Sequence, residues 1–90
     1  MIGDKLNQYV IKSILGEGGM AYVYLAHDTS FNIDVAIKVL KKEFIHNQNI
    51  RKRFIAEAKS MRKMAHPNII KVTDLIDAGD IVAFVMEYIE

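Results

Sequence analysis

The sequence predicts an α+β domain in which one main helix packs on a five-stranded antiparallel sheet, in the order β-β-β-α-β-β. Runs of β-branched and aromatic residues alternate with short turn segments up to residue 40. From Asn49 onward the apolar residues recur at three- and four-residue intervals, which indicates a helix, and the strand pattern returns after Pro67. With 90 residues and no linker-like stretch, the chain is expected to form one domain, residues 1–90.

Three strands are expected to come first. β-rich runs cover residues 9–15, 21–26 and 34–40. A glycine-rich segment, residues 16–20, separates the first two runs, and a polar segment, residues 28–32, separates the second from the third. Such short connections favour antiparallel neighbours.

The helix is expected to begin near Asn49 and to end before His66 and Pro67, because proline disfavours helix in the residue before it. Its apolar stripe consists of Ile50, Phe54, Ala58, Met61 and Ala65. The last two strands are predicted over residues 69–76 and 81–89, with hairpin-turn residues at 77–80 between them.

The composition excludes several classes of function. A net charge of +1 provides no broad field for collecting nucleic acid or anionic membrane. Without cysteine there is no thiolate nucleophile, and three scattered histidines are poor metal ligands, so no metal site is expected in this chain. No apolar run is long enough to span a bilayer, and residues 1–10 lack the apolar stretch of a signal peptide. We therefore expect a soluble, cytoplasmic protein that does not bind nucleic acid.

Basic residues are concentrated in one part of the chain. Nine of the twelve fall between Lys38 and Lys63. They indicate either a solvated helix face or a docking surface for an acidic or phosphorylated partner, for which residues 51–53 are the best candidate. Three adjacent cations do not decide between these two interpretations.

The glycine-rich segment at 16–19 is the first candidate binding element. Because glycine has no Cβ, its peptide N–H groups can approach a bound anion closely, so a phosphate cradle is one interpretation and a plain hairpin turn is the other. A dinucleotide-binding fingerprint is excluded because these glycines precede a strand, residues 21–25, rather than a helix. A Walker-type loop is excluded because the Gly-Lys-Ser/Thr ending is absent.

Lys38 and Glu57 are a candidate ion pair. Lys38 lies in residues 35–40, a run apolar enough to be buried on both faces, where an ammonium needs a partner unless it reaches water at a strand edge. Glu57 shares a helical stripe with Phe54, so its carboxylate is expected on the face that packs on the sheet. The alternative is that Glu57 lies at the margin of the stripe and pairs with Arg53 one turn earlier.

Five linked motifs carry a resemblance to a known family: residues 15–24, 35–38, 57, 66–70 and 85–88. In order and spacing they resemble the N-terminal, ATP-binding lobe of the bacterial, eukaryotic-like serine/threonine protein kinases. The resemblance covers the chain from Tyr9 to Glu90. It departs from the pattern at Ala21, which stands where the third loop glycine is expected and should stiffen the loop only slightly.

The resemblance implies where ATP binds. The loop over the phosphates consists of Gly16, Glu17, Gly18, Gly19, Met20 and Ala21. Lys38 contacts the α- and β-phosphates and Glu57 orients it, so these two residues are the expected catalytic pair. The side chains expected to sandwich the adenine are Leu15, Val23 and Ala36.

The resemblance also implies a gatekeeper at Met86 and a hinge formed by Glu87, Tyr88 and Ile89. In the hinge, the backbone of Glu87 and Ile89 is expected to form hydrogen bonds with the edge of the adenine. The expected contributions to the apolar regulatory stack of the family are Met61 and Val72.

The expected function of the whole protein is transfer of the ATP γ-phosphoryl group to Ser and Thr hydroxyls of protein substrates. The chain is expected to end in the hinge at Glu90, without the C-terminal lobe, because nothing in it matches the His-Arg-Asp catalytic loop or the Asp-Phe-Gly magnesium motif. Residues 77–79 are not taken for that motif, because no catalytic loop precedes them. Magnesium ligands are therefore expected only in the complete enzyme, and the chain alone is not expected to turn over.

The alternative is a non-catalytic module that binds nucleotide or a partner, such as part of a pseudokinase. Protein substrates are expected to bind through the missing lobe, and a membrane anchor beyond residue 90 stays open. Self-association is also expected, through the helix at 49–64 or through apolar side chains that the missing lobe would cover: Met61, Met64, Val72, Met86 and Ile89.

Overall fold

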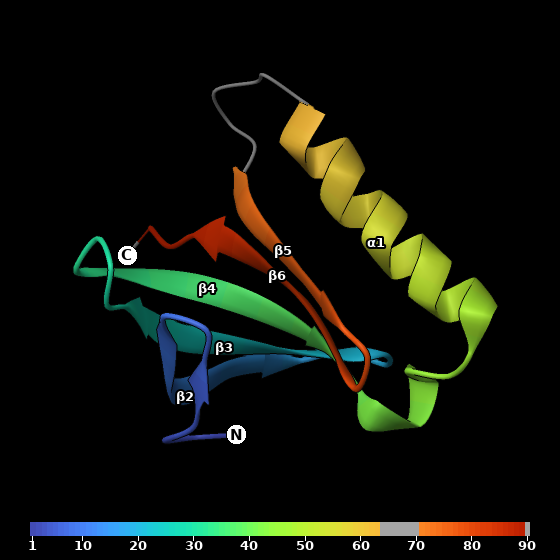
Figure 1. Ribbon diagram of the computed structural model, residues 1–90, viewed down its shortest axis with the longest axis horizontal. Helices are drawn as coiled ribbons and strands as arrows, with labels where there is room; N and C mark the ends of the chain where they lie inside the picture. The colour runs from blue at the N-terminus through green and yellow to red at the C-terminus, as the bar shows by residue number, and fades with distance from the viewer. Residues whose placement is uncertain (64–70, 90) are drawn as a thin grey trace.

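The computed structural model describes residues 1–63 and 71–89 (Figure 1). Its elements, in chain order, are β1 (Lys5–Leu6), β2 (Tyr9–Glu17), β3 (Ala21–Asp28), β4 (Ile33–Leu40), the 3₁₀ helix η1 (Lys42–Phe44), α1 (Gln48–Lys63), β5 (Val72–Ala78) and β6 (Ile81–Glu87). The predicted α+β class and the order of the main elements are confirmed. The structure adds two short elements that the sequence did not reveal, β1 and η1, so that the sheet has six strands rather than five.

The antiparallel sheet has the strand order β1-β2-β3-β4-β6-β5, and it curls strongly. The hydroxyl of Tyr9 on β2 donates a hydrogen bond to Oδ2 of Asp74 on β5 at 2.8 Å, although three strands lie between these two in the sheet. Burial and the neighbouring Asp74 carboxylate raise the pKa of Tyr9 above its ordinary value, so the hydroxyl keeps its proton and remains a donor. The bond therefore closes the curl by joining β2 to the edge strand β5.

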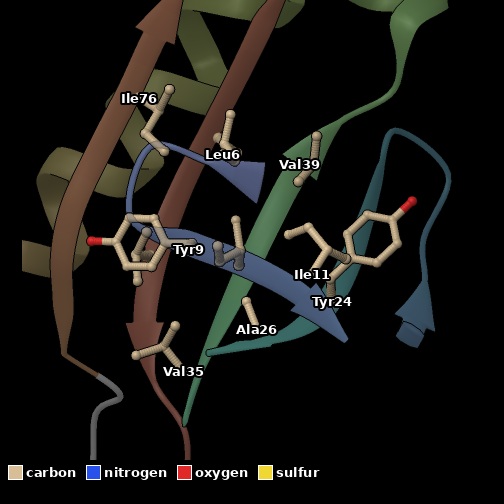
Figure 2. Close-up of a cluster of buried hydrophobic side chains, with 11 residues drawn as sticks. Leu6, Tyr9, Ile11, Tyr24, Ala26, Val35, Val39 and Ile76 are labelled. Carbon is tan, nitrogen blue, oxygen red and sulfur yellow. The ribbon is translucent and has the colours of Figure 1, made fainter. Parts of the chain in front are cut away.

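The curl encloses an apolar cluster on the inner face of the sheet (Figure 2). Its buried members are Leu6, Tyr9, Ile11, Tyr24, Ala26, Val35, Ile37, Val39, Ile76, Ala83 and Val85. All six strands contribute to this set, so burying it favours the curled form over a flat sheet.

The outer face of the sheet packs on α1. Phe54 and Ala58 are the buried residues of the helix, and the Phe54 ring lies 5.0 Å from the Phe84 ring of β6, centroid to centroid. Figure 1 shows α1 lying beside β5, at one end of the sheet. The helix has 16 residues, and no helix in the described part of the chain is long and apolar enough to cross a membrane.

The β3–β4 hairpin is longer than the sequence predicted, because a side chain organises its turn. Oδ1 of Asp28 accepts hydrogen bonds from the N–H groups of Ser30 and Phe31 at 2.9 and 3.3 Å. Asn32 has a φ of 55°, a conformation that asparagine tolerates better than most residues. The strands therefore pair up to Asp28 on one side and from residue 33 on the other.

Other boundaries also differ from the prediction. β2 continues past residue 15 to Glu17, β5 includes the first two of the predicted turn residues at 77–80, and β6 ends at Glu87. The end of the predicted helix from Met64 onward, the motif at 66–70 and residue 90 lie outside the described residues.

We expect Tyr9→Phe to lower the free energy of unfolding by about 1 to 2 kcal/mol, because the Asp74 carboxylate loses a donor while the ring stays packed. Urea unfolding measures this change. The matched variant Asp74→Asn keeps an oxygen that can accept the bond and should lose less. A Tyr9→Phe protein with the wild-type midpoint would show that the bond does not hold the curl.

Candidate functional site

A cleft of about 600 Å³ lies between the glycine-rich loop, the outer face of β3 and β4, and α1. The lining residues are Gly16, Glu17, Gly18, Gly19, Met20, Ala21, Val23, Lys38, Leu40, Ile50, Arg53, Phe54 and Glu57. The structure thus brings together the six predicted loop residues, one predicted adenine contact and the predicted ion pair. Two of these lining residues, Lys38 and Arg53, carry a positive charge.

The three loop glycines are not required by the fold that surrounds them. Gly16, Gly18 and Gly19 all lack a positive φ, so their backbone conformation is open to other residues. A Cβ built on Gly16 or Gly19 meets no atom within 4 Å, and one built on Gly18 meets the carbonyl oxygen of Ala21 at an ordinary 3.7 Å. Side chains at these positions would instead occupy open space, which points to a ligand that approaches the backbone closely.

The loop itself is a tight connection between β2 and β3. The N–H of Gly18 donates a hydrogen bond to the carbonyl oxygen of Ala21 at 2.8 Å. The register then aligns Gly16 with Val23 and Val23 with Lys38. Gly16, Val23 and Lys38 therefore lie in one row across three neighbouring strands, which puts the lysine in line with the start of the loop.

Lys38 and Glu57 form the expected ion pair, with 2.9 Å between Nζ and Oε1. The Lys38 ammonium also lies 5.8 Å from the centre of the Phe84 ring. Of the two outcomes left open for Lys38, the pairing is present, and the side chain also reaches water: it is 31% exposed and that of Glu57 is 45% exposed. The pair opens toward solvent because it lies at the cleft, and a pair this exposed adds little to stability. Its consequence is geometric, because it fixes an ammonium beside the loop.

The position of Glu57 follows from how α1 is held against the sheet. Ala58, the next residue, is buried and has only a methyl side chain, so the helix backbone lies close to the strands. Arg51, six residues before Glu57, donates hydrogen bonds to the carbonyl oxygens of Ile45 and Gly79 at 3.2 and 3.0 Å. It also forms an ion pair with the carboxylate of Asp77.

Arg51 therefore connects the first turns of α1 to the turn between β5 and β6. The sequence grouped it with Lys52 and Arg53 as a possible docking surface, but its guanidinium is used within the chain. Sequence reasoning missed this role, because its partners are 6, 26 and 28 residues away.

The residues expected around the adenine lie partly on one surface. Ala36 and Met86 are cross-strand partners on β4 and β6, both buried on the outer face of the sheet. Val23 on β3 lies on the same face, opposite Lys38 and diagonal to Ala36. Leu15 falls at a register shift between β2 and β3 and is exposed. None of Leu15, Ala36 and Met86 lines the 600 Å³ cleft.

The expected hinge residues are at the end of the described chain. Glu87 is the last residue of β6, and its N–H donates a hydrogen bond to the carbonyl oxygen of Lys71 at 3.0 Å. Tyr88 is half-buried and Ile89 is exposed. The role of these three residues stays a prediction.

Residues 9–90 match the protein kinase domain. The serine/threonine-protein kinase PrkC of Bacillus subtilis (strain 168) is 41% identical over 91 residues, covering 100% of this chain and 14% of that protein. The probable serine/threonine-protein kinase CPE1738 of Clostridium perfringens (strain 13 / Type A) is 43% identical over 91 residues, covering 100% of this chain and 13% of that protein. The chain thus spans about one seventh of the length of these curated relatives.

The fold of this chain is also similar to that of a solved kinase domain. The chain superposes on the PknI kinase domain of Mycobacterium tuberculosis with a TM-score of 0.78 and 27% identity, covering 100% of this chain and 36% of that one. The apo form of PpkA-294, at a TM-score of 0.82 and 21% identity, is similar in fold.

We expect Arg51→Met to loosen α1, because three acceptors lose a charged donor. The free energy of unfolding should fall by about 1 to 2 kcal/mol, since the interaction is only partly shielded from water. Urea unfolding measures the loss, and amide exchange locates it in α1 and in the β5–β6 turn. The matched control is Lys52→Met, at the exposed neighbouring position. Equal behaviour of the two variants would contradict the role given to Arg51.

Proposed function

Because the chain belongs to the protein kinase family, we propose that its cleft holds the triphosphate of ATP and that the full-length protein transfers the γ-phosphoryl group to Ser or Thr hydroxyls of proteins. In this reaction the hydroxyl oxygen bonds to the γ-phosphorus as the bond to the bridging oxygen of ADP breaks. The observation that carries the proposal is the open space beside the loop glycines, with the Lys38 ammonium fixed next to it.

The cleft offers the groups that a polyphosphate needs. The loop allows backbone N–H groups to approach phosphate oxygens, because Gly16 and Gly19 place no side chain in the way. Lys38 supplies a cation, and Glu57 holds it in one position at 2.9 Å. We therefore assign Lys38 to the phosphates and Glu57 to the orientation of Lys38.

The adenine is assigned to the surface formed by Ala36, Val23 and Met86. Small and aliphatic side chains on neighbouring strands form a shallow apolar floor there, on the same face of the sheet as Lys38. A planar base packs well on such a surface. Leu15 and the backbone of residues 87–89 are proposed to complete this part of the site.

Magnesium, which the family implies, is not assigned to residues of this chain. Among the described residues, Glu17 and Glu57 are the acidic residues that line the cleft, and each carboxylate is paired with a lysine. They therefore do not fit a magnesium site, and we propose that the metal is bound by the nucleotide and by other parts of the full-length protein.

Self-association stays a proposal with less support than the sequence suggested. Two of the apolar side chains on which it rested, Val72 and Met86, are 2% and 8% exposed and belong to the core. Met61 is partly buried, and Ile89 is exposed. Sedimentation velocity over a range of concentrations tests it, and a single monomeric species throughout would contradict it.

In the full-length gene product, we expect Lys38→Met to reduce phosphotransfer to a protein substrate by about 100-fold or more, as the loss of one donor to a developing phosphate charge does in other enzymes. Glu57→Gln should reduce it less, because the amide can still bond Lys38. The matched control is Lys12→Met, which removes a cation paired with Asp34 on β4, away from the cleft.

Wild-type protein that binds ATP in calorimetry but transfers no phosphoryl group would favour the non-catalytic alternative. Phosphotransfer that is equal in wild type and Lys38→Met would overturn the site assignment.

A further inference from the structure

Lys41, the residue after β4, makes three contacts with the glycine-rich loop and the strand that follows it. Its N–H donates a hydrogen bond to the carbonyl oxygen of Met20 at 2.9 Å. Its ammonium donates to Oε2 of Glu17 at 2.8 Å. The same ammonium lies 4.9 Å from the centre of the Tyr22 ring. The side chain is only 12% exposed, well below the exposure of the other sheet lysines in ion pairs.

The strand register shows from which side Lys41 holds the loop. Glu17 pairs with Tyr22, and Tyr22 pairs with Val39, so these three side chains share one face. Lys41 follows Val39 by two positions and lies on that face as well. Lys38 pairs with Val23 and lies on the opposite face, where the cleft is. Lys41 therefore contacts the loop from behind and does not contact a ligand in the cleft.

The loop has few other anchors. Gly18 and Gly19 have no side chains, and Met20 is exposed. Gly16, Glu17 and Ala21 are paired in the sheet. Between these paired ends, the described chain holds the loop by the backbone bond from Gly18 to Ala21 and by the bonds that Lys41 makes to Met20 and Glu17.

We propose that Glu17 and Lys41 form a latch that sets the height of the glycine-rich loop above the cleft, which makes Lys41 a positioning residue for the phosphates of ATP. The inference rests on the proposed function. The hydrogen bond to Glu17 raises the pKa of Lys41 above its ordinary value, so Lys41 stays charged at neutral pH.

Two other roles for this pair predict different results. If Lys41 only stabilises the β3–β4 hairpin, its loss lowers the denaturation midpoint but leaves the Michaelis constant for ATP unchanged. If Lys41 only neutralises the Glu17 carboxylate near the phosphates, removing the carboxylate as well restores ATP binding. A latch requires both residues, so removing either one has the same effect as removing both.

The test uses the full-length gene product with Lys41→Met, Glu17→Met and the double variant; methionine at residue 17 leaves no acceptor for the Lys41 ammonium. The expected result is a rise in KM for ATP of about three- to tenfold in each single variant, the size expected for a partly buried ion pair with a cation–π contact. The double variant should show the same rise, and kcat of Lys41→Met at saturating ATP should change by less than about twofold, because the catalytic pair is untouched. Lys12→Met, which breaks another lysine–carboxylate pair of the sheet, should leave KM unchanged.

Amide hydrogen exchange of residues 17–21 without nucleotide provides a readout that does not depend on activity. We expect faster exchange in Lys41→Met and Glu17→Met than in Lys12→Met. Unchanged exchange, unchanged KM in the single variants, or a double variant restored to wild-type KM would overturn the latch. If the wild-type protein lacks phosphotransfer, the proposed function fails, and the exchange result still decides whether Lys41 holds the loop.

Discussion

The alternation of side chains along β4 is the constraint on which the rest of the molecule depends. Val35, Ile37 and Val39 point into the curl and form part of the inner cluster. Ala36 and Lys38 lie between them and point to the outer face, where α1 and the cleft are. A shift of one residue in the register would bury the ammonium in the inner core and remove the cation from the cleft. The same packing that stabilises the sheet therefore fixes the site.

The helix adds the second half of the site through a small contact area. Phe54 and Ala58 are its buried residues, and Arg51 ties its beginning to the β5–β6 turn. Because the ion pair of Lys38 with Glu57 is exposed, it cannot pull the helix into place by itself. The pair therefore forms as a result of where α1 lies and does not set that position. Residues remote from the cleft, such as Arg51, thus control whether Glu57 can hold Lys38.

The sequence predicted the parts of this structure that depend on local patterns. The strand and helix periods placed Lys38 and Glu57 on elements that face each other, and their side chains pair as expected. The curl was not predictable, because the bond from Tyr9 to Asp74 joins residues 65 apart. Likewise, nothing in the local pattern distinguished Arg51 and Lys41 from their solvated neighbours. The sequence left open how far Lys38 is exposed, because a strand pattern does not show that a cleft opens beside one residue.

At the three loop glycines, folding and ligand binding favour different residues. Their backbone angles and the space around them would accept alanine without strain in the folded chain. Replacing them could even favour folding, since glycine loses the most backbone entropy when the chain becomes ordered. A selection for abundance or heat resistance would therefore drive these positions away from glycine, whereas a selection for ligand binding would hold them. In this loop, the sequence that would give the most stable fold therefore differs from the sequence that leaves room for a ligand.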